Sequence, residues 1–279
     1  MSESRTALRH EPGLDKCGNR KYFKAVPVTL KRRRKVGVSW KSTKGGTRRW
    51  TAIPIQIAFL GVSAAKGQIP RGNMEKIRLT YFDFDGGRGE PARLALSMAG
   101  IDFEDCRISF PEFSAIRAAT PLNAVPLMEV NHVAYTQSDA INRFGGRLAG
   151  LYPSDPWQAF LCDEVLEIVE DAYHAFGRTL GMQGDELKAA RMALAGGMYT
   201  RCLKVLDKRL EAAGEEYFAD HRLTVADLKV YVWIKRLKSG GQDHVPLDLT
   251  DQLAPRLVGH MERIAAEPGV AAYYAARGQ

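Results

Sequence analysis

The sequence is poor in cysteine and has no long apolar run. Its four cysteines lie far apart, with no Cys-x-x-Cys pair and no Cys/His spacing of the kind that holds zinc. No apolar run approaches the roughly 18–20 residues that a membrane-spanning helix needs. We therefore expect no metal site and no membrane partner. With 279 residues and 45% hydrophobic content, the chain can bury a large core in one or two domains.

Acidic residues are scarce in the first part of the chain. Residues 1–73 carry seventeen Lys/Arg against three Asp/Glu, a net charge of +14 (17 − 3), whereas the whole chain carries +8. The other 206 residues therefore carry −6 (8 − 14), which argues against nucleic acid as the partner of the folded part.

This basic segment also lacks a regular hydrophobic period. Residues 1–73 are predicted to be a disordered extension, or an artefact of too early a start codon, because Met74 immediately precedes the first convincing strand. A nucleic-acid-binding arm and a secretion signal around Arg48-Arg49 are the alternatives. We favour the disordered extension or the start-codon artefact. A secretion signal normally lies at the start of a chain, whereas this one would begin near residue 47.

Residues 74–150 predict a small α/β domain with the order β-α-β, then β-β-α. The expected elements are a strand from Ile77, a helix from Glu90, a strand at residues 102–108, a loop or short helix at 111–119, a hairpin at 125–136 and a helix through Arg147. Ser138 or Asp139 is expected to be the N-cap of that last helix.

Residues 151–279 predict an all-helical domain, because the strand signals disappear after a proline-containing linker at 151–156. Apolar residues at helical spacing indicate helices at 157–180, 186–213, 225–238 and 251–266. Thr224 and Asp227 fit a capping box at the start of the third of these helices.

The glycine-rich turn after the first strand suggests phosphate binding, but its spacing does not fit. Gly86-Gly87-Arg88-Gly89 does not match G-x-G-x-x-G, and the absence of a G-K-[ST] ending excludes a P-loop. What remains is a tyrosine, Tyr81, near the carboxyl end of a strand and close to a helix N-terminus. Such a place favours an anion.

Four motifs in order give the chain a specific resemblance to a known family. They are Tyr81 with the Gly87-Arg88 turn, Val125-Pro126 followed by Thr136-Gln137-Ser138-Asp139, Glu170-Asp171, and Thr224-Val225-Ala226-Asp227. Over about residues 74–279 the chain resembles a soluble glutathione transferase of the tyrosine type, closest to the sigma and pi classes. The resemblance implies a thioredoxin-like α/β domain (74–150) followed by an all-α domain (151–279).

The resemblance also implies a glutathione site. Pro126 would be a cis-proline, and the backbone of Val125 would pair with the cysteinyl part of glutathione. Gln137 and Ser138 would hold the γ-glutamyl end. Asp171 would reach glutathione bound in the neighbouring subunit, which implies a homodimer.

Three further positions are assigned by resemblance with departures from the family pattern. Phe113 and Arg117 stand where the family often has tryptophan and lysine against the glycyl carboxylate. Phe113 lacks an N–H donor, while Arg117 keeps the charge, so weaker binding at this end is expected. Arg88 would support Tyr81, although the turn is one residue longer than in many relatives.

By the same resemblance, Tyr81 would be the catalytic residue. Only a few per cent of a free thiol with a pKa of roughly 8.5 is thiolate at neutral pH. A neutral tyrosine hydroxyl can donate to the sulfur and stabilise the thiolate, which then attacks a hydrophobic electrophile. The expected role is detoxification in the cytoplasm, with glutathione as cosubstrate. Two alternatives stay open: a non-catalytic binding or structural module, and a glutathione-dependent isomerase or peroxidase at the same site.

Overall fold

The computed structural model describes residues 76–278, which belong to one compact unit, Met74–Gln279. The expectations for residues 1–73 lie outside the described residues. Within the described part, no helix is long and apolar enough to cross a membrane.

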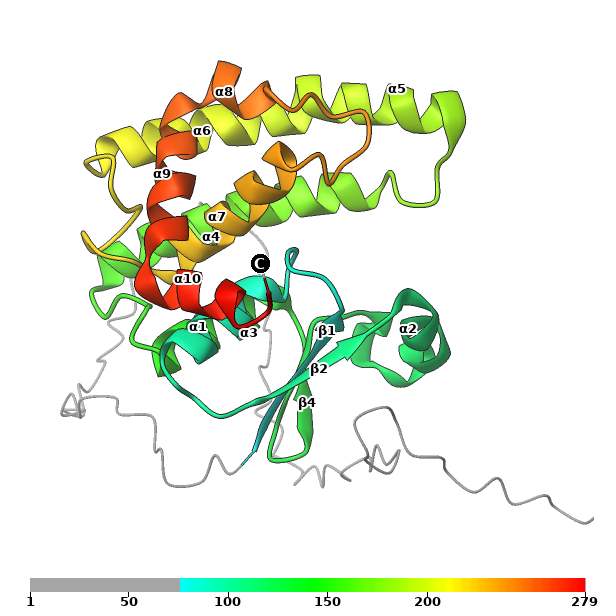
Figure 1. Ribbon diagram of the computed structural model, residues 1–279, viewed down its shortest axis with the longest axis vertical. Helices are drawn as coiled ribbons and strands as arrows, with labels where there is room; N and C mark the ends of the chain where they lie inside the picture. Colours follow the sequence, from blue (N-terminus) through cyan, green and yellow to red (C-terminus); the bar gives the residue numbers. More distant parts are fainter. Residues whose placement is uncertain (1–75, 279) are drawn as a thin grey trace, which may run out of the picture. The chain divides into compact units, whose positions relative to one another are not determined.

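A four-stranded mixed sheet forms the first half of this unit (Figure 1). Its strands are β1 (Ile77–Phe82), β2 (Glu104–Ile108), β3 (Leu127–Val130) and β4 (Val133–Tyr135). They lie in the order β2-β1-β3-β4; β1 is parallel to β2 and antiparallel to β3, which is antiparallel to β4. Five of the six residues of β1 are buried, as expected for a central strand that is covered on both faces.

The predicted hairpin is confirmed. Asn131 and His132, between β3 and β4, both have positive φ, at 49° and 67°. Two successive residues with positive φ are typical of a tight two-residue hairpin turn. Ahead of β3, the Val125–Pro126 peptide bond is cis, as the resemblance implied.

Three helices accompany the sheet: α1 (Glu90–Met98), α2 (Phe110–Ile116) and α3 (Ser138–Leu148). Helices α1 and α3 pack against each other between the sheet and the helical half, whereas α2 lies apart from them, beyond the sheet (Figure 1).

The expected N-cap of α3 is wrong. Gln137 is the N-cap, with a φ of 72° and no side-chain capping bond, and Ser138 is already helical. The hydroxyl of Ser138 donates a hydrogen bond to Glu170, which is 32 residues further along the chain, and does not cap the helix.

The second half of the unit contains helices only. They are α4 (Pro156–Gly177), α5 (Gly184–Leu194), a π-helical turn (Ala195–Tyr199), α6 (Thr200–Ala212), α7 (Val225–Lys238), α8 (Leu249–Leu253), α9 (Pro255–Ala266) and α10 (Pro268–Ala275). Helix α7 is central: eleven of its fourteen residues are buried, and it packs on α4, α9 and α1. A helix buried on most of its sides needs partners for its buried charges, which here are Asp227 and Lys229.

The predicted capping box at the start of α7 is confirmed. Asp227 Oδ2 accepts a hydrogen bond from the backbone N–H of Thr224 at 2.8 Å. Its Oδ1 accepts from the backbone N–H of Phe218 at 3.0 Å and lies 3.0 Å from His260 Nε2. Asp227 is fully buried, so this one carboxylate joins α7 to the preceding loop and to α9.

Some helix boundaries differ from the prediction. The expected helix at 186–213 is α5 and α6 with the π-helical turn between them, at Gly196-Gly197. The expected helix at 251–266 is α8 and α9, because Pro255 lacks an N–H and begins a new helix. Helix α10 was not predicted. The fold class, an α/β domain with a thioredoxin-like order of elements followed by helices only, is confirmed.

Candidate active site

Tyr81 lies near the end of β1, and the glycines of the following turn pack against it. Its side chain is buried, and its hydroxyl oxygen accepts a hydrogen bond from the backbone N–H of Arg88 at 3.1 Å. An added Cβ at Gly87 would lie 2.6 Å from this oxygen, and one at Gly89 would lie 2.6 Å from the tyrosine ring. The turn therefore closes over the tyrosine, which requires glycine at both positions.

These surroundings keep the Tyr81 hydroxyl neutral. Burial raises its pKa above the ordinary value of 10.0, although the N–H of Arg88 and the charges of Arg88 and Arg93 oppose this rise. The contact with Arg88 uses the phenol oxygen as acceptor, so the phenol proton can be donated to a ligand atom. A phenol held in this way is suited to stabilise an anion that binds beside it.

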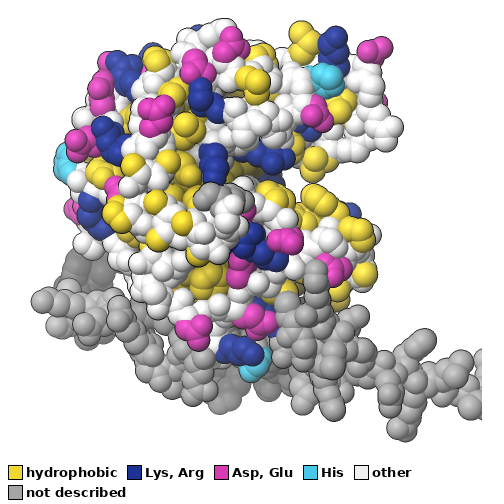
Figure 2. All heavy atoms as spheres, viewed as in Figure 1, with side chains coloured by type: hydrophobic (Ala, Val, Ile, Leu, Met, Phe, Trp, Pro, Cys, Tyr) yellow, Lys and Arg dark blue, Asp and Glu magenta, His cyan; other side chains and the backbone are white. Residues whose placement is uncertain are grey.

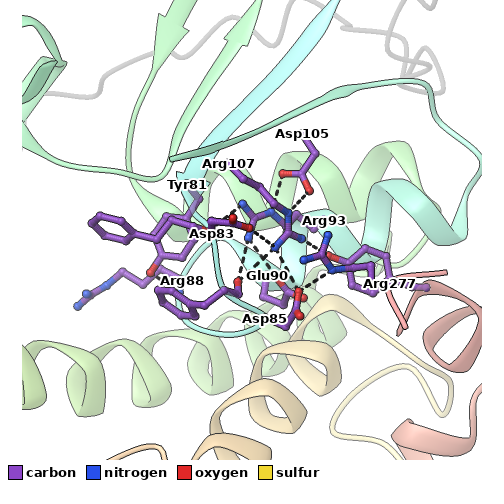
Figure 3. Close-up of polar contacts among 12 residues, drawn as sticks. Tyr81, Asp83, Asp85, Arg88, Glu90, Arg93, Asp105, Arg107 and Arg277 are labelled. Carbon is purple, nitrogen blue, oxygen red and sulfur yellow. Dashed lines mark hydrogen bonds and ion pairs between the residues drawn. The ribbon is translucent and has the colours of Figure 1, made fainter. Parts of the chain in front are cut away.

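A cluster of charged side chains, which runs from the buried Glu90 and Arg93 to the exposed Arg277, holds the turn in place (Figure 3). The carbonyl oxygens of Phe82 and Phe84 accept hydrogen bonds from Arg93 Nη2 and Nη1, at 3.2 and 3.3 Å. Arg93 is fully buried and pairs with Glu90 and Asp105. The cluster consists of Asp85, Glu90, Arg93, Asp105, Arg107 and Arg277. It fixes the path of the backbone on one side of Tyr81.

Arg88 joins the other side of the turn to α4, and its side chain extends away from the charged cluster (Figure 3). Its Nε donates to Glu170 Oε1 at 2.5 Å, and its guanidinium lies 5.3 Å from the ring centre of Tyr173. The other oxygen of Glu170, Oε2, accepts from Ser138 Oγ at 3.1 Å. Glu170 thus connects the tyrosine turn with the start of α3.

A buried lysine completes this group. Lys229 Nζ donates to Glu170 Oε2 at 2.9 Å and to Asp139 Oδ1 at 2.5 Å. Burial by itself would raise the pKa of Glu170, but Lys229 and Arg88 outweigh burial and hold this pKa at about 2. For Asp139 burial prevails, and its pKa is raised despite Lys229.

The contacts of Glu170 and Lys229 in this group were not predicted from the sequence. Glu170 lies in one of the four motifs, but the resemblance assigned a role in glutathione binding only to its neighbour Asp171. A signal for Lys229 was present, because it is the one charged residue in the apolar run LKVYVWI of α7. A lysine in such a run needs buried acidic partners.

The structure brings some of the other predicted residues together. Arg117 Nε donates to the carbonyl oxygen of Asn123 at 3.2 Å, and its guanidinium lies 6.0 Å from the ring centre of Phe113. Val125 and Pro126 lead into β3, the neighbour of β1.

Two predicted residues stay apart from these contacts. Gln137 is exposed beside Ser138. Asp171 is exposed on α4 and makes no hydrogen bond or ion pair with any other residue of the described chain. Among residues 76–278, no group of three or more His, Cys, Asp or Glu side chains could hold a metal ion.

Aromatic rings extend from Tyr81 toward the surface. The ring centre of Phe82 lies 5.3 Å from Tyr81 and 4.4 Å from Phe110, and that of Phe84 lies 5.7 Å from Tyr81. Phe110, on α2, is 67% exposed. Figure 2 shows a hollow between the upper helices and the region of α2, with hydrophobic side chains about its mouth and basic side chains at its inner end. An apolar molecule could lie against these rings.

The comparisons with known proteins agree with this arrangement. Residues 170–277 match the family described as "Glutathione S-transferase, C-terminal domain". The chain is 31% identical to the hematopoietic prostaglandin D synthase of Gallus gallus over 200 residues, which cover 72% of this chain and 96% of that protein. The chain belongs to the glutathione S-transferase family.

Other members of the family confirm the relationship. This glutathione S-transferase chain is 32% identical to glutathione S-transferase 1 of Ascaris suum over 161 residues, which cover 56% of the chain and 78% of that protein. Its fold matches the sigma class glutathione S-transferase of Fasciola hepatica with a TM-score of 0.63 at 25% identity, covering 73% of this chain and 97% of that one. The resemblance drawn from the four motifs is thereby confirmed.

Proposed function

We propose that this glutathione S-transferase binds glutathione, stabilises its thiolate with the Tyr81 hydroxyl and transfers it to a hydrophobic electrophile. The observation that carries the proposal is the state of Tyr81: a buried, neutral phenol whose oxygen accepts from Arg88 and whose proton can be donated. The N-terminus of α1 lies just after this turn and adds a favourable dipole for an anion.

In the proposed reaction the thiol proton leaves to solvent and the sulfur stays as thiolate, hydrogen-bonded by Tyr81. The thiolate attacks an electrophilic carbon, a carbon–sulfur bond forms, and the leaving group departs with its electron pair. Tyr81 keeps its proton throughout. Lowering the thiol pKa by about two units needs roughly 2.7 kcal/mol, within reach of one charge-assisted hydrogen bond and a helix dipole.

We assign the parts of glutathione to residues around Tyr81. The Val125 backbone before cis-Pro126 takes the cysteinyl part, and Gln137 and Ser138 take the γ-glutamyl end. The Phe113–Arg117 pair lies toward the glycyl end. The electrophile lies against Phe82, Phe84 and Phe110. The rings of Phe82 and Phe84 contact Tyr81, and Phe110 contacts Phe82.

Asp171 supports a homodimer in this proposal. It is exposed and makes no hydrogen bond or ion pair within the described chain, as expected of a side chain that reaches glutathione in a neighbouring subunit. We further propose a cytoplasmic location and a role in detoxification. Sedimentation of the purified full chain tests whether it is a dimer. Sedimentation and glutathione binding measured on Asp171→Ala then show whether Asp171 acts on subunit assembly or on glutathione affinity.

The proposal is tested by conjugation of glutathione to chlorodinitrobenzene, followed from pH 5.5 to 9 for the wild type and Tyr81→Phe. The wild-type rate should rise with an apparent pKa well below that of free glutathione. In Tyr81→Phe this pKa should move up toward 8.5, because the donor to the sulfur is gone. Identical profiles for the two proteins would contradict the role of Tyr81.

A glutathione-dependent isomerase is the second candidate. It is favoured by the identity of 31% with the prostaglandin D synthase of Gallus gallus, over nearly the whole of that protein. An assay for prostaglandin D formation separates the two activities. Glutathione binding without either activity would instead favour the non-catalytic module.

A further inference from the structure

Lys229 is a fully buried ammonium in the middle of the central helix α7. Its Nζ donates to Asp139 Oδ1 at 2.5 Å, to the carbonyl oxygen of Leu166 at 3.0 Å and to Glu170 Oε2 at 2.9 Å. These three acceptors use the three protons of the ammonium. Because they come from α3 and α4, Lys229 ties the sheet half of the unit to the helical half.

The carboxylate of Glu170 is held from four sides. Its Oε1 accepts from Arg88 and lies 3.5 Å from His174 Nε2. Its Oε2 accepts from Lys229 and from Ser138. Both oxygens are therefore fixed in position, one toward the Tyr81 turn and the other toward α3.

This arrangement decides what Ser138 can offer to a ligand. Its hydroxyl proton is donated to Glu170, so the hydroxyl oxygen can only accept a further hydrogen bond. Its backbone N–H, in the first turn of α3, has no acceptor within that helix. An acceptor beside a donor matches the ammonium and the carboxylate of an α-amino acid group, which the γ-glutamyl end of glutathione carries.

We propose that Lys229 is a positioning residue, which holds Glu170 and, through it, the hydroxyl of Ser138 in the orientation that binds the γ-glutamyl end of glutathione. This inference rests on the glutathione site proposed above. Lys229 itself lies behind the site and does not touch the ligand, because its three protons are already used within the protein.

Charge balance explains why a lysine is needed at this place. Arg88 and Lys229 carry two positive charges, and Asp139 and Glu170 carry two negative ones. The remaining groups facing Glu170 are the His174 imidazole and the phenols of Tyr81 and Tyr173. Without Lys229, Asp139 and Glu170 share a buried site with a single guanidinium, which contacts Glu170 alone, and one of the two carboxylates takes up a proton. A ligand ammonium arriving at that site would then displace this proton.

The test is calorimetric titration of the full chain with S-methylglutathione at pH 7.5, in two buffers of different ionisation enthalpy. This ligand has no thiol proton, so any proton released reports on the protein. Lys229→Met should weaken binding by at least about tenfold and release a proton on binding. The matched control is Lys238→Met, which removes a half-buried lysine from the end of the same helix, where it pairs with Asp251. It should bind like the wild type, without proton release.

A double variant keeps the test decisive if Lys229→Met does not fold. Lys229→Met with Asp139→Asn removes one charge of each sign, so it should fold and release no proton. It should still bind several-fold more weakly than the wild type, because Glu170 has lost its tether to α7. Wild-type affinity in this folded double variant, or in Lys229→Met, would overturn the role of Lys229 and leave the proposed function standing. A wild type that does not bind S-methylglutathione would instead overturn the glutathione site itself.

Discussion

Replacing Gly87 by alanine tests whether the turn holds Tyr81 in its working position. At Gly87 the backbone has a φ of +70°, and an added Cβ would lie 2.6 Å from the Tyr81 hydroxyl oxygen and 3.2 Å from two ring carbons of Phe84. An ordinary contact distance is about 3.5 Å, so one of the groups must move by roughly 1 Å. Tyr81 is buried between the sheet and the turn, so it cannot swing away freely.

The size of the effect of Gly87→Ala follows from the positive φ at this position and from the contact of the added Cβ with Tyr81. The left-handed backbone conformation costs an alanine about 1–2 kcal/mol, which lowers stability. A displacement of about 1 Å at the reacting centre can cost up to about 100-fold in rate. We therefore expect Gly87→Ala to reduce kcat/KM for conjugation by about 30- to 100-fold, and to raise the apparent pKa of the bound thiol toward that of free glutathione.

Gly100→Ala is the matched control for backbone strain. Gly100 has a φ of +61°, and an added Cβ there would meet nothing within 4 Å. Both variants should lose similar stability in urea unfolding, but only Gly87→Ala should lose activity. A wild-type pH–rate profile in Gly87→Ala would refute the reasoning, as would an equal loss of activity in Gly100→Ala.

Two other predictions concern stability. Asp227→Asn should lower the free energy of unfolding by about 3 kcal/mol, because a fully buried carboxylate accepts from Thr224 and Phe218 and contacts His260. Urea unfolding measures this, with the exposed Asp251→Asn as a control that should change little. Glu170 has its pKa lowered from 4.5 to about 2, so the stability it contributes is complete above about pH 4.5 and is lost as the pH falls toward 2. The unfolding midpoint should therefore fall further between pH 6 and pH 3 in the wild type than in Glu170→Gln. An equal fall in the two proteins would contradict the low pKa assigned to Glu170.

The elements that were predicted well are those whose signals are local. The capping box at Thr224 and Asp227, the Asn131-His132 hairpin and the strand at β1 each depend on residues close in sequence. The boundaries that failed depend on packing: the π-helical turn between α5 and α6, and the short helix α10, have no local signal strong enough to mark them.

The residues of the candidate site likewise divide into those with a local sequence signal and those that only packing brings together. Tyr81, its glycine-rich turn and Ser138 were found from motifs that occupy a few consecutive residues each. The partners of these residues were not, because Glu170 is 82 residues from Arg88 and Lys229 is 59 residues from Glu170. Helical spacing from Leu166 and Tyr173 places Glu170, and not its neighbour Asp171, on the inward face of α4, but it does not indicate which residues Glu170 meets there.

The sequence by itself determined the family, the order of strands and helices in the α/β half, and the tyrosine that the proposed chemistry requires, because these depend on local pattern and on motif order. Only the tertiary structure decided that the turn closes over Tyr81 and that Glu170 joins Arg88, Ser138 and Lys229. Those contacts arise where α3, α4 and α7 meet. There, burial makes an unpaired charge so costly that each one must find a partner far away along the chain.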